Sequence, residues 1–397
     1  MKQYRKFIIT IVCTFLLGLI GIGAVVIYID PFMHYHKPID SFPYVVDDQL
    51  SQVPGLALHE DYDSVLLGSS VTANFSGSWF KEAFDLDLLK LPYNGAYPKD
   101  IANAFERVER RHSSEQTREL TSEQTSEQTS ELTSKQASEL TSEQTSELTS
   151  EQTEEREVSA PSLKTVYIAI DPTAYSAPTD QTKYELPSHL YDDNLLTDVS
   201  YLYNMDVLLN YIVKPALSKG SATPKEEYFS NYELFDGCFS KEFTLSGYER
   251  PDLSDTPVDT GALVPDVILN LQENIIPMIE RNPDTNFVFF FPPRSILYWD
   301  NFHQTGEIGM ILQMERCIIE ELLKYPNVEI HYFENDSDII TNLDNYMDMT
   351  HYSRDICEQL VIEMASGNHL LTADNYEDIL DTFETWLYQY DYDSIFE

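Results

Sequence analysis

The 397-residue sequence predicts an α/β fold, in which a central parallel sheet of about five strands lies between layers of helices. Three observations support this prediction. Short apolar runs alternate with segments of helical periodicity, as in repeated strand–helix–strand units with right-handed crossovers. The runs are short and mostly apolar, as expected of strands in a parallel sheet that is covered on both faces. Glycine, proline or polar residues follow the runs and end the strands. The runs cover residues 64–67, 86–92, 166–170, 287–291 and 328–333.

The chain begins with a segment that is long enough to cross a membrane. Residues 7–29 contain no charged side chain, and a helix of 23 residues is about 35 Å long, which exceeds the thickness of a bilayer core. Lys2, Arg5 and Lys6 precede this segment, and Asp30 follows it. By the positive-inside rule, we expect a single-pass protein of the cell membrane with a cytoplasmic N-terminus and an extracytoplasmic remainder.

A cleaved signal peptide is the alternative interpretation of this segment. The nearest match to a cleavage site is the sequence Gly-Ile-Gly-Ala at residues 21–24. This match is poor, and the apolar stretch is longer than the hydrophobic core of a usual signal peptide. The length of the segment therefore favours a retained anchor, with the bilayer as a partner of residues 7–29.

The composition is strongly acidic. The sequence contains 67 acidic and 25 basic residues, which gives a formal net charge of −42. Because contacts to phosphate groups require lysine and arginine, this balance argues against nucleic acid as a partner and suits neutral or cationic substrates. Of the four cysteines, Cys13 lies in the apolar segment, and Cys238, Cys317 and Cys357 lack the spacing of metal ligands. We expect buried thiols, and the sequence points to no metal ion or cofactor.

The chain after the anchor is interpreted as one domain with several additions. Residues 1–29 form the cytoplasmic tip and the anchor, residues 30–62 form a juxtamembrane linker, and residues 63–372 form the α/β domain. Residues 373–397 are expected to form an acidic, aromatic helix that packs on this domain. Residues 113–157 repeat the unit Ser-Glu-Gln/Leu-Thr, which brings like charges together in a helix. We expect a solvated insertion here, with an isolated helix as the alternative.

A second interruption of the domain, over residues 179–264, leaves the third predicted strand. We expect a helix over residues 195–217 and a polar loop over residues 220–257. Because this segment departs from the carboxyl end of a strand, it could lie over the ligand crevice and shape a substrate pocket. A helical packing layer without contact to substrate explains the pattern equally well.

The first motif that carries chemistry is Gly68-Ser69-Ser70, directly after the first predicted strand. In an open α/β sheet the ligand crevice lies outside the carboxyl ends of the strands, so a serine at this point faces the site. An ordinary strand-ending turn is the alternative, since glycine and serine are common in turns. The second predicted strand leads to Asn94-Gly95, a further turn sequence on the same edge of the sheet.

Asp348 and His351 form the second motif, at the turn that opens a predicted helix over residues 353–364. At a separation of three residues, the carboxylate can accept the Nδ1 hydrogen of the imidazole and leave Nε2 free as a base. A helix cap beside a surface histidine is the alternative. A serine nucleophile needs a base, a group that orients the base and donors for the oxyanion, and the motifs together supply a candidate for each role.

With these motifs the chain resembles the SGNH/GDSL hydrolase superfamily, and within it the membrane-anchored extracytoplasmic branch that includes the D-alanyl-transfer protein DltD and the alginate O-acetylation proteins. Gly68-Ser69-Ser70 matches the first block of the family with serine in place of the usual aspartate, which makes Ser70 the nucleophile. Asp348 and His351 match the last block, which carries the base and its orienting carboxylate. The resemblance implies a flavodoxin-like three-layer sandwich.

The match to the family is less complete at the oxyanion hole. Asn94-Gly95 lies where the family keeps a glycine whose N–H group binds the oxyanion, and the N–H group of Ser70 is the second donor. After the third strand the family has Gly-x-Asn-Asp, whereas this chain has Ile-Asp-Pro-Thr at residues 170–173. An ionised Asp171 would repel the developing negative charge, which leaves the side chain of Asn94 as a candidate for the missing amide.

Together these roles predict an extracytoplasmic serine esterase or O-acyltransferase. Ser70, deprotonated by His351, attacks an ester carbonyl and passes the acyl group to water or to a sugar or polyol hydroxyl. The anchor and the resemblance imply a cell-surface polysaccharide or teichoic-acid-like polymer as substrate, beside a membrane O-acyltransferase as partner. Arg294 and Asp171 are candidate contacts to substrate, although Arg294 also suits a structural salt bridge.

Two other classes of function fit the sequence. A catalytically inactive surface binding or scaffold protein, which keeps the SGNH fold and partners a membrane O-acyltransferase, would show the same pattern. A metal-dependent hydrolase would need ligands such as His34, His36, His59 and Asp171. His34 and His36 alone are a weak metal signal, because zinc requires three or four ligands.

Overall fold

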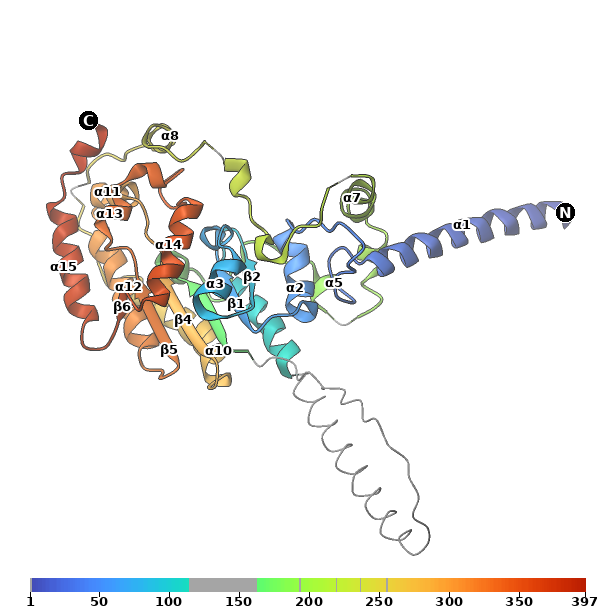
Figure 1. Ribbon diagram of the computed structural model, residues 1–397, viewed down its shortest axis with the longest axis horizontal. Coiled ribbons are helices and arrows are strands. Elements are labelled where there is room, and N and C mark those ends of the chain that lie inside the picture. The colour runs from blue at the N-terminus through green and yellow to red at the C-terminus, as the bar shows by residue number, and fades with distance from the viewer. Residues whose placement is uncertain (1, 114–162, 193, 219, 236, 255) are drawn as a thin grey trace, which may run out of the picture.

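A six-stranded sheet forms the centre of the computed structural model, which describes residues 2–113, 163–192, 194–218, 220–235, 237–254 and 256–397 (Figure 1). The strands are β1 (Ser64–Gly68), β2 (Leu88–Pro92), β3 (Thr165–Ala169), β4 (Asn286–Phe291), β5 (Val328–Tyr332) and β6 (Leu370–Leu371). Their order across the sheet is β2-β1-β3-β4-β5-β6. The strands β1 to β5 pair in parallel, and β6 runs antiparallel beside β5.

The five predicted strands are confirmed, and their burial explains why the sequence reveals them. Every residue of β1, β2 and β3 is buried, and β4 is buried from Phe287 onward. Strands covered on both faces keep hydrophobic side chains at successive positions, which produces the continuous apolar runs. The sequence shows no sign of β6, because a strand of 2 residues has no periodicity.

Helices cover both faces of the sheet. The main ones are a helix over residues 98–113, α2 (Gln49–His59), α3 (Gly77–Phe84), α9 (Val264–Asn270), α10 (Ile276–Arg281), α12 (Ile308–Leu322) and α14 (Arg354–Ala365). On one face, strand residues such as Val65 and Val166 share a core with α2, α9, α10, α12 and the helix over residues 98–113. On the other face, Leu66 and Tyr167 pack against α3 and α14. The fold is therefore mixed α/β with a mostly parallel sheet.

A helix within residues 373–397, as predicted, is present as α15 (Tyr376–Gln389), which packs against α12. Its apolar stripe of Leu380, Phe383 and Leu387 lies in the larger core. Of the predicted insertion over residues 113–157, all but the first residue lies outside the described residues. The remaining short helices and turns are η2 (Pro172–Ser176), α5 (Ser188–Tyr191), η4 (Lys225–Glu227), η5 (Tyr232–Phe235), η6 (Leu271–Ile275), α11 (Ile296–Thr305), α13 (Ser337–Ile340), η7 (Leu343–Asn345) and η8 (Tyr392–Phe396).

The helix predicted over residues 195–217 is interrupted once. The chain forms α6 (Val199–Leu202) and then a continuous helical stretch that includes a π-helical segment, η3 (Val207–Val213), and α7 (Lys214–Leu217). The break falls at Asn204, whose Oδ1 accepts a hydrogen bond from the N–H group of Asp206 at 2.8 Å. Asparagine side chains compete for backbone N–H groups in this way and interrupt helices. The expected loop over residues 220–257 also contains a helix, α8 (Lys241–Ser246).

The N-terminal helix α1 (Lys2–Ile29) projects from the domain as a long rod with the N-terminus at its free end (Figure 1). Residues Gln3–Ile29 of this helix are long and apolar enough to cross a membrane. Such a helix is compatible with a single-pass membrane anchor and with a signal sequence.

The base of α1 is joined to the domain through Asp30, which is fully buried. Its carboxylate accepts hydrogen bonds from the N–H groups of the turn that follows, at His34 (3.0 Å), Tyr35 (2.7 Å) and His36 (3.0 Å). The same carboxylate accepts from the hydroxyl of Tyr201 in α6 at 2.7 Å. This set of contacts, called the Asp30 junction below, fixes the direction in which α1 leaves the domain.

A lysine lies inside the fold, next to the chain that follows β1. Lys90 of β2 is 1% exposed, and its Nζ donates to the carbonyl oxygens of Ala73 (2.9 Å) and Phe75 and to the hydroxyl of Ser230 (2.7 Å). Three acceptors match the three hydrogens of an ammonium group. Burial lowers the pKa of Lys90 to about 7. The side chain thus ties β2 to the loop after β1 and to the segment over residues 179–264.

We expect the stability of the wild-type protein, relative to a Lys90→Met variant, to increase as the pH rises from about 7 to about 10. In this interval the unfolded chain binds a proton that native Lys90 has lost, so raising the pH favours the native state. Below about pH 7 the lysine is protonated in both states and the difference is constant. Thermal unfolding of the two full-length proteins in detergent measures the effect. A stability difference that stays constant up to pH 10 would contradict it.

Candidate active site

The chain between β1 and α3 places Ser70 at the carboxyl edge of the sheet. Gly68 ends β1 with a φ of +151°, and a Cβ atom at this position would lie 2.7 Å from Cγ2 of Thr72 and 3.1 Å from Cβ of Ala169. The close approach explains why the motif needs glycine here. A 3-10 turn, η1 (Ser70–Thr72), follows and has Ser70 as its first residue.

The loop between η7 and α14 brings the Asp-x-x-His motif to the same edge. An isolated β-bridge between Tyr346 and Tyr352 closes this loop. The hydroxyl of Tyr346 donates to the carbonyl oxygen of Pro293 after β4 (3.0 Å), and that of Tyr352 donates to the carbonyl oxygen of Val71 in η1 (3.2 Å). The loop is therefore attached both to the sheet and to the turn that carries the serine.

Ser70, His351 and Asp348 are brought together into a hydrogen-bonded triad. The distance from Ser70 Oγ to His351 Nε2 is 2.7 Å, and the distance from His351 Nδ1 to Asp348 Oδ2 is also 2.7 Å. If Nδ1 carries the proton that Asp348 accepts, Nε2 faces the serine as an acceptor. The side chain of His351 is 30% exposed and that of Asp348 is 44% exposed, so solvent and ligands can reach the triad.

The surroundings of Asp348 keep its carboxylate ionised. Burial alone would raise the pKa of Asp348, but the hydrogen bond and the charge of His351 outweigh this effect and hold the pKa at about 2. The second oxygen of the carboxylate, Oδ1, accepts from the N–H groups of Thr350 and His351, both at 2.8 Å. At neutral pH the group is thus a fixed negative charge beside the imidazole.

A cleft of about 270 Å³ opens beside Ser70 and His351. One part of its wall is polar, with Asn74, Asn94 and Asn231, and another part is apolar or aromatic. The sequence pattern identified neither Asn74 nor the contributions of the segment over residues 179–264. The segment does line the cleft. Of the two interpretations of its sequence, the one that places it over the crevice is therefore correct. The lining residues are Ser70, Val71, Asn74, Asn94, Asn231, Phe235, Phe239, Met347, His351 and Tyr352.

The Asn94-Gly95 turn has the conformation that its sequence predicts. The N–H group of Ala96 donates to the carbonyl oxygen of Tyr93 at 2.9 Å, and Gly95 has a φ of +70°, as in a type II turn. Two hydrogen bonds join Asn94 to the side chain of Gln49. The backbone N–H group of Asn94 donates to Gln49 Oε1 (2.8 Å), and Gln49 Nε2 donates to Asn94 Oδ1 (3.1 Å). Asn94 lines the cleft, whereas Gly95 lies against the side chain of Lys183.

Arg294 and Asp171, the candidate substrate contacts, lie outside the lining of the cleft. The side chain of Arg294 is 4% exposed and pairs with Glu334 at 2.5 Å and with Asp171 at 3.2 Å. Asp171 Oδ1 also accepts from the hydroxyl of Thr173 at 2.7 Å. The arginine therefore acts as a structural cation that joins the ends of β3, β4 and β5, and it balances the charge of Asp171.

Two of the three histidines that a metal site would need, His34 and His36, are used in other contacts. His34 Nε2 lies 3.3 Å from Asp198 Oδ1, and His36 Nε2 lies 2.9 Å from the carbonyl oxygen of Ile27. Both belong to the Asp30 junction, whereas Asp171 lies at the carboxyl edge of the sheet. Among the described residues, no group of three or more His, Cys, Asp or Glu side chains is arranged to hold a metal ion.

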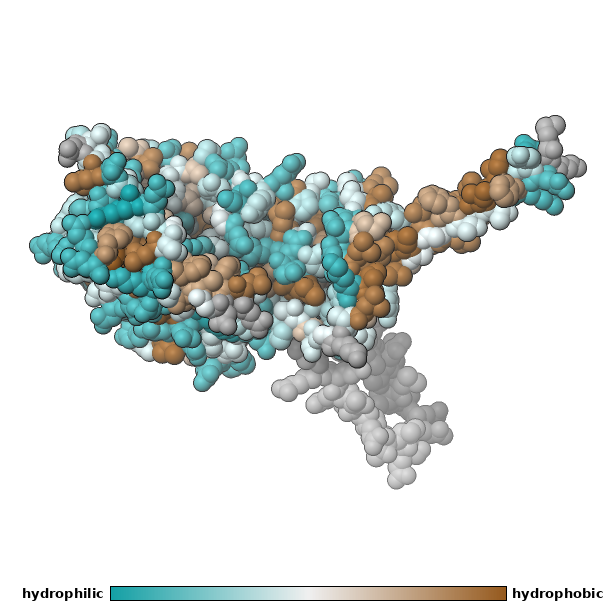
Figure 2. All heavy atoms as spheres, turned by 90° about the horizontal axis from the view of Figure 1, so that it is seen from above, coloured by the Kyte–Doolittle hydropathy of each residue, from teal (hydrophilic) through white to brown (hydrophobic). Residues whose placement is uncertain are grey.

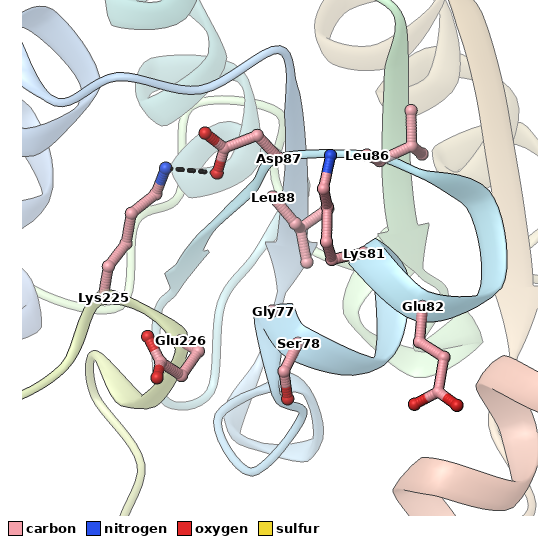
Figure 3. A pocket seen from close by; sticks show the side chains of 9 residues that line it. All are labelled: Gly77, Ser78, Lys81, Glu82, Leu86, Asp87, Leu88, Lys225 and Glu226. Atoms are coloured by element: carbon pink, nitrogen blue, oxygen red, sulfur yellow. Dashed lines mark hydrogen bonds and ion pairs between the residues drawn. The ribbon is translucent and has the colours of Figure 1, made fainter.

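A larger hollow of about 550 Å³ lies at the opposite edge of the sheet, beside the start of β2 (Figure 3). Two lysines line it, and each is paired with a carboxylate: Lys81 with Asp85, and Lys225 with Asp87 at 2.5 Å. Figure 3 shows Lys225 reaching toward Asp87 across its mouth. The hydroxyl that lines the hollow, that of Ser78, lies 2.8 Å from the hydroxyl of Ser76, whereas Ser70 contacts an imidazole, so the smaller cleft at Ser70 is the better candidate for an active site.

The chain matches no protein-family model, no curated protein and no solved structure. A functional assignment therefore depends on the geometry of the site.

We expect a Gly68→Ala variant to be destabilised by about 1–3 kcal/mol, because alanine at a positive φ is strained and its Cβ would overlap Thr72. Thermal unfolding of the full-length protein measures the change. Gly247→Ala is the matched control, since a Cβ at Gly247 would have no atom closer than 3.9 Å and its φ is −94°. Equal stability of the two variants would show that the close approach at Gly68 is not a constraint.

Proposed function

We propose that this chain is a serine esterase or O-acyltransferase of the SGNH type, which acts outside the cytoplasm on acyl esters of a cell-surface glycopolymer. One observation carries the proposal: Ser70, His351 and Asp348 form a continuous chain of hydrogen bonds with 2.7 Å at each step. A strand-ending turn and a helix cap would each explain one motif, but neither explains why a serine meets a histidine 281 residues away.

In the proposed reaction, Ser70 Oγ attacks the carbonyl carbon of an ester while His351 Nε2 takes the serine proton. The tetrahedral intermediate collapses, the bond to the alcohol oxygen breaks, and the alcohol leaves with the proton from His351. Asp348, ionised at neutral pH, stabilises the imidazolium that forms in between. Water or a sugar hydroxyl then attacks the acyl-enzyme with His351 again as the base, which gives hydrolysis in one case and acyl transfer in the other.

The oxyanion hole of this reaction has donors from two places. The N–H groups of Ser70 and Val71 lie at the start of a helical turn, where backbone donors have no partner within the turn. The amide of Asn94 projects from the clamped turn after β2 and lines the same cleft. Gly95 lies outside the lining of the cleft, and the Asn94 side chain takes the place of the asparagine that the family resemblance leads one to expect.

The size and the lining of the cleft favour a small acyl group. A volume of about 270 Å³ accommodates a short acyl chain and part of a sugar ring, and Phe235, Phe239 and Met347 supply apolar contacts for the acyl group. With a net charge of −42, the protein suits esters whose acyl or alcohol part is neutral or cationic. A surface polysaccharide or a teichoic-acid-like polymer that carries such esters, supplied by a membrane O-acyltransferase, meets both conditions.

Two features support the SGNH type and the retained anchor. The order β2-β1-β3-β4-β5 is that of flavodoxin-like sheets, and the proposed triad lies beyond the carboxyl ends of the strands, where such sheets bind ligands.

Gly23 and Val26 near the base of α1 are buried. Cleavage at residues 21–24 would break a packed contact, which favours a helix that stays attached, with its basic N-terminus in the cytoplasm.

A catalytically inactive scaffold of the same fold is the second candidate function. It is favoured by Asp171, an acidic residue where the family resemblance leads one to expect asparagine. A scaffold would retain the cleft and its partners but would not require a reactive serine.

A fluorophosphonate probe tests the proposed function. We expect the full-length protein in detergent to be labelled at Ser70, and a Ser70→Ala variant to show no labelling, because the probe reacts with serines activated by a base. A Ser69→Ala variant is the matched control and should keep its labelling. Absence of Ser70-dependent labelling in a folded protein would support the scaffold and overturn the esterase.

An Asn94→Ala variant tests the oxyanion hole. We expect kcat for hydrolysis of a p-nitrophenyl ester to fall about 100-fold to 1,000-fold, with little change in KM, because the amide contacts the oxygen most strongly in the transition state. Asn74→Ala, at another polar position of the cleft, should have a smaller effect on kcat. Equal kcat values for Asn94→Ala and the wild type would exclude Asn94 as a donor.

A further inference from the structure

The segment over residues 195–217 exposes an unusual number of large apolar side chains. Leu195 is 76% exposed, Leu196 82% and Leu217 80%. Val199, Met205 and Leu209 are also exposed. Figure 2 shows hydrophobic surface that continues from α1 onto the adjacent end of the domain. Large apolar patches on soluble proteins mark contacts with a protein or a membrane. We call these side chains the 195–217 surface.

Residues 195–217 carry apolar side chains both on the side that faces the domain and on the side that faces away from it. Within η3, Val207 and Ile212 are buried in a small core with Val26 of α1, whereas Leu209 and Val213 of the same turns face outward. On the outer side, Leu209 and Val213 lie beside a polar row of Asp206, Asn210 and Lys214, which are linked by hydrogen bonds. A helix with an apolar and a polar side that are both exposed suits the boundary between an apolar medium and water.

The 195–217 surface also lies beside the helix that crosses the membrane. Both α6 and η3 contact α1 directly, and Tyr201 stacks on Phe32 with 5.3 Å between ring centroids. The Asp30 junction holds these parts together. The position of the surface relative to α1 is therefore fixed by packing.

The position along α1 at which Tyr203 makes contact indicates which medium surrounds the 195–217 surface. A Cβ atom on Gly23 would lie 3.3 Å from the hydroxyl of Tyr203. Gly23 precedes the last residue of α1, Ile29, by six residues, or about 9 Å of helix. Tyr203 thus lies at a level within the apolar span, and tyrosine is a residue that favours the bilayer–water interface. Leu209, one of the exposed leucines, belongs to η3, which also contacts α1.

We propose that the 195–217 surface inserts into the headgroup and outer acyl region of the lipid bilayer beside α1, as a second membrane contact of the chain. This proposal rests on the proposed anchoring of α1 and is independent of the proposed reaction. Lipid is the occupant because the surface is continuous with the membrane-spanning helix and lies at the depth of its last turns. Such elements bind by burying apolar side chains at the boundary between headgroups and acyl chains.

Fluorescence quenching by brominated lipid tests the proposal. Leu196→Trp and Leu209→Trp variants of the full-length protein are reconstituted in phosphatidylcholine vesicles with and without bromine on the acyl chains. Leu253→Trp is the matched control, since Leu253 is an exposed leucine (66%) that precedes a contact with α11, far from α1. We expect the fluorescence added by L196W and by L209W to be quenched at least twofold more than that added by L253W, above the background of the three native tryptophans.

Flotation of the same vesicles reports anchoring separately, and fluorophosphonate labelling reports the reaction. If the protein floats but L196W and L253W are quenched equally, the surface does not contact lipid and the proposal is overturned. If L196W emission is blue-shifted without quenching and the protein is a dimer in crosslinking, a second copy covers the surface and the proposal is likewise overturned. A protein that fails to float removes the anchor on which the proposal depends and overturns it as well.

Discussion

The parallel pairing of β1 to β5 is the constraint on which the site depends. Parallel strands end at one edge of a sheet, so the segments that follow them meet there however far apart they are in the sequence. Ser70 follows β1 and His351 follows β5, at opposite ends of the domain sequence, yet their side chains share a hydrogen bond. The backbone arrangement brings the two segments to one edge, and local contacts such as the bond from Tyr352 to Val71 set the final distance.

The same edge holds a set of charges, of which Arg294 and Glu334 are buried and Asp171 is partly exposed, that supports the triad without touching it. Arg294 after β4 pairs with Glu334 after β5 and with Asp171 after β3. The next residue, Ser295, donates from both its N–H group and its hydroxyl to the carbonyl oxygen of Met349, each at 3.0 Å. Met349 lies between Asp348 and His351, so the ion pairs that hold the end of β4 also hold the loop that carries these two residues. Removing one partner of such a buried pair costs several kcal/mol.

The sequence predicted the features that depend on residues close together in the chain. Buried parallel strands leave continuous apolar runs, and an Asp-x-x-His turn needs only three residues to form its hydrogen bond. What the sequence could not predict depends on single side-chain bonds or on distant partners. The interruption at Asn204 depends on one bond to the N–H group of Asp206, and β6 exists because a neighbouring strand is available. The wall of the cleft at Asn231 comes from a segment whose path is set by tertiary contacts, including the bond from Lys90 to Ser230.

The Asp30 junction limits how far the domain can move relative to α1. A helix tethered through a flexible linker would let a domain sample a hemisphere above the membrane, with an effective concentration that falls with linker length. Here the turn after α1 is closed by the buried carboxylate of Asp30, and the chain enters the domain without slack. Packed contacts thereby set the direction of α1 relative to the cleft at Ser70. If α1 spans a bilayer, the cleft opens at one height beside it, and reach becomes a condition for binding alongside the chemistry of the triad.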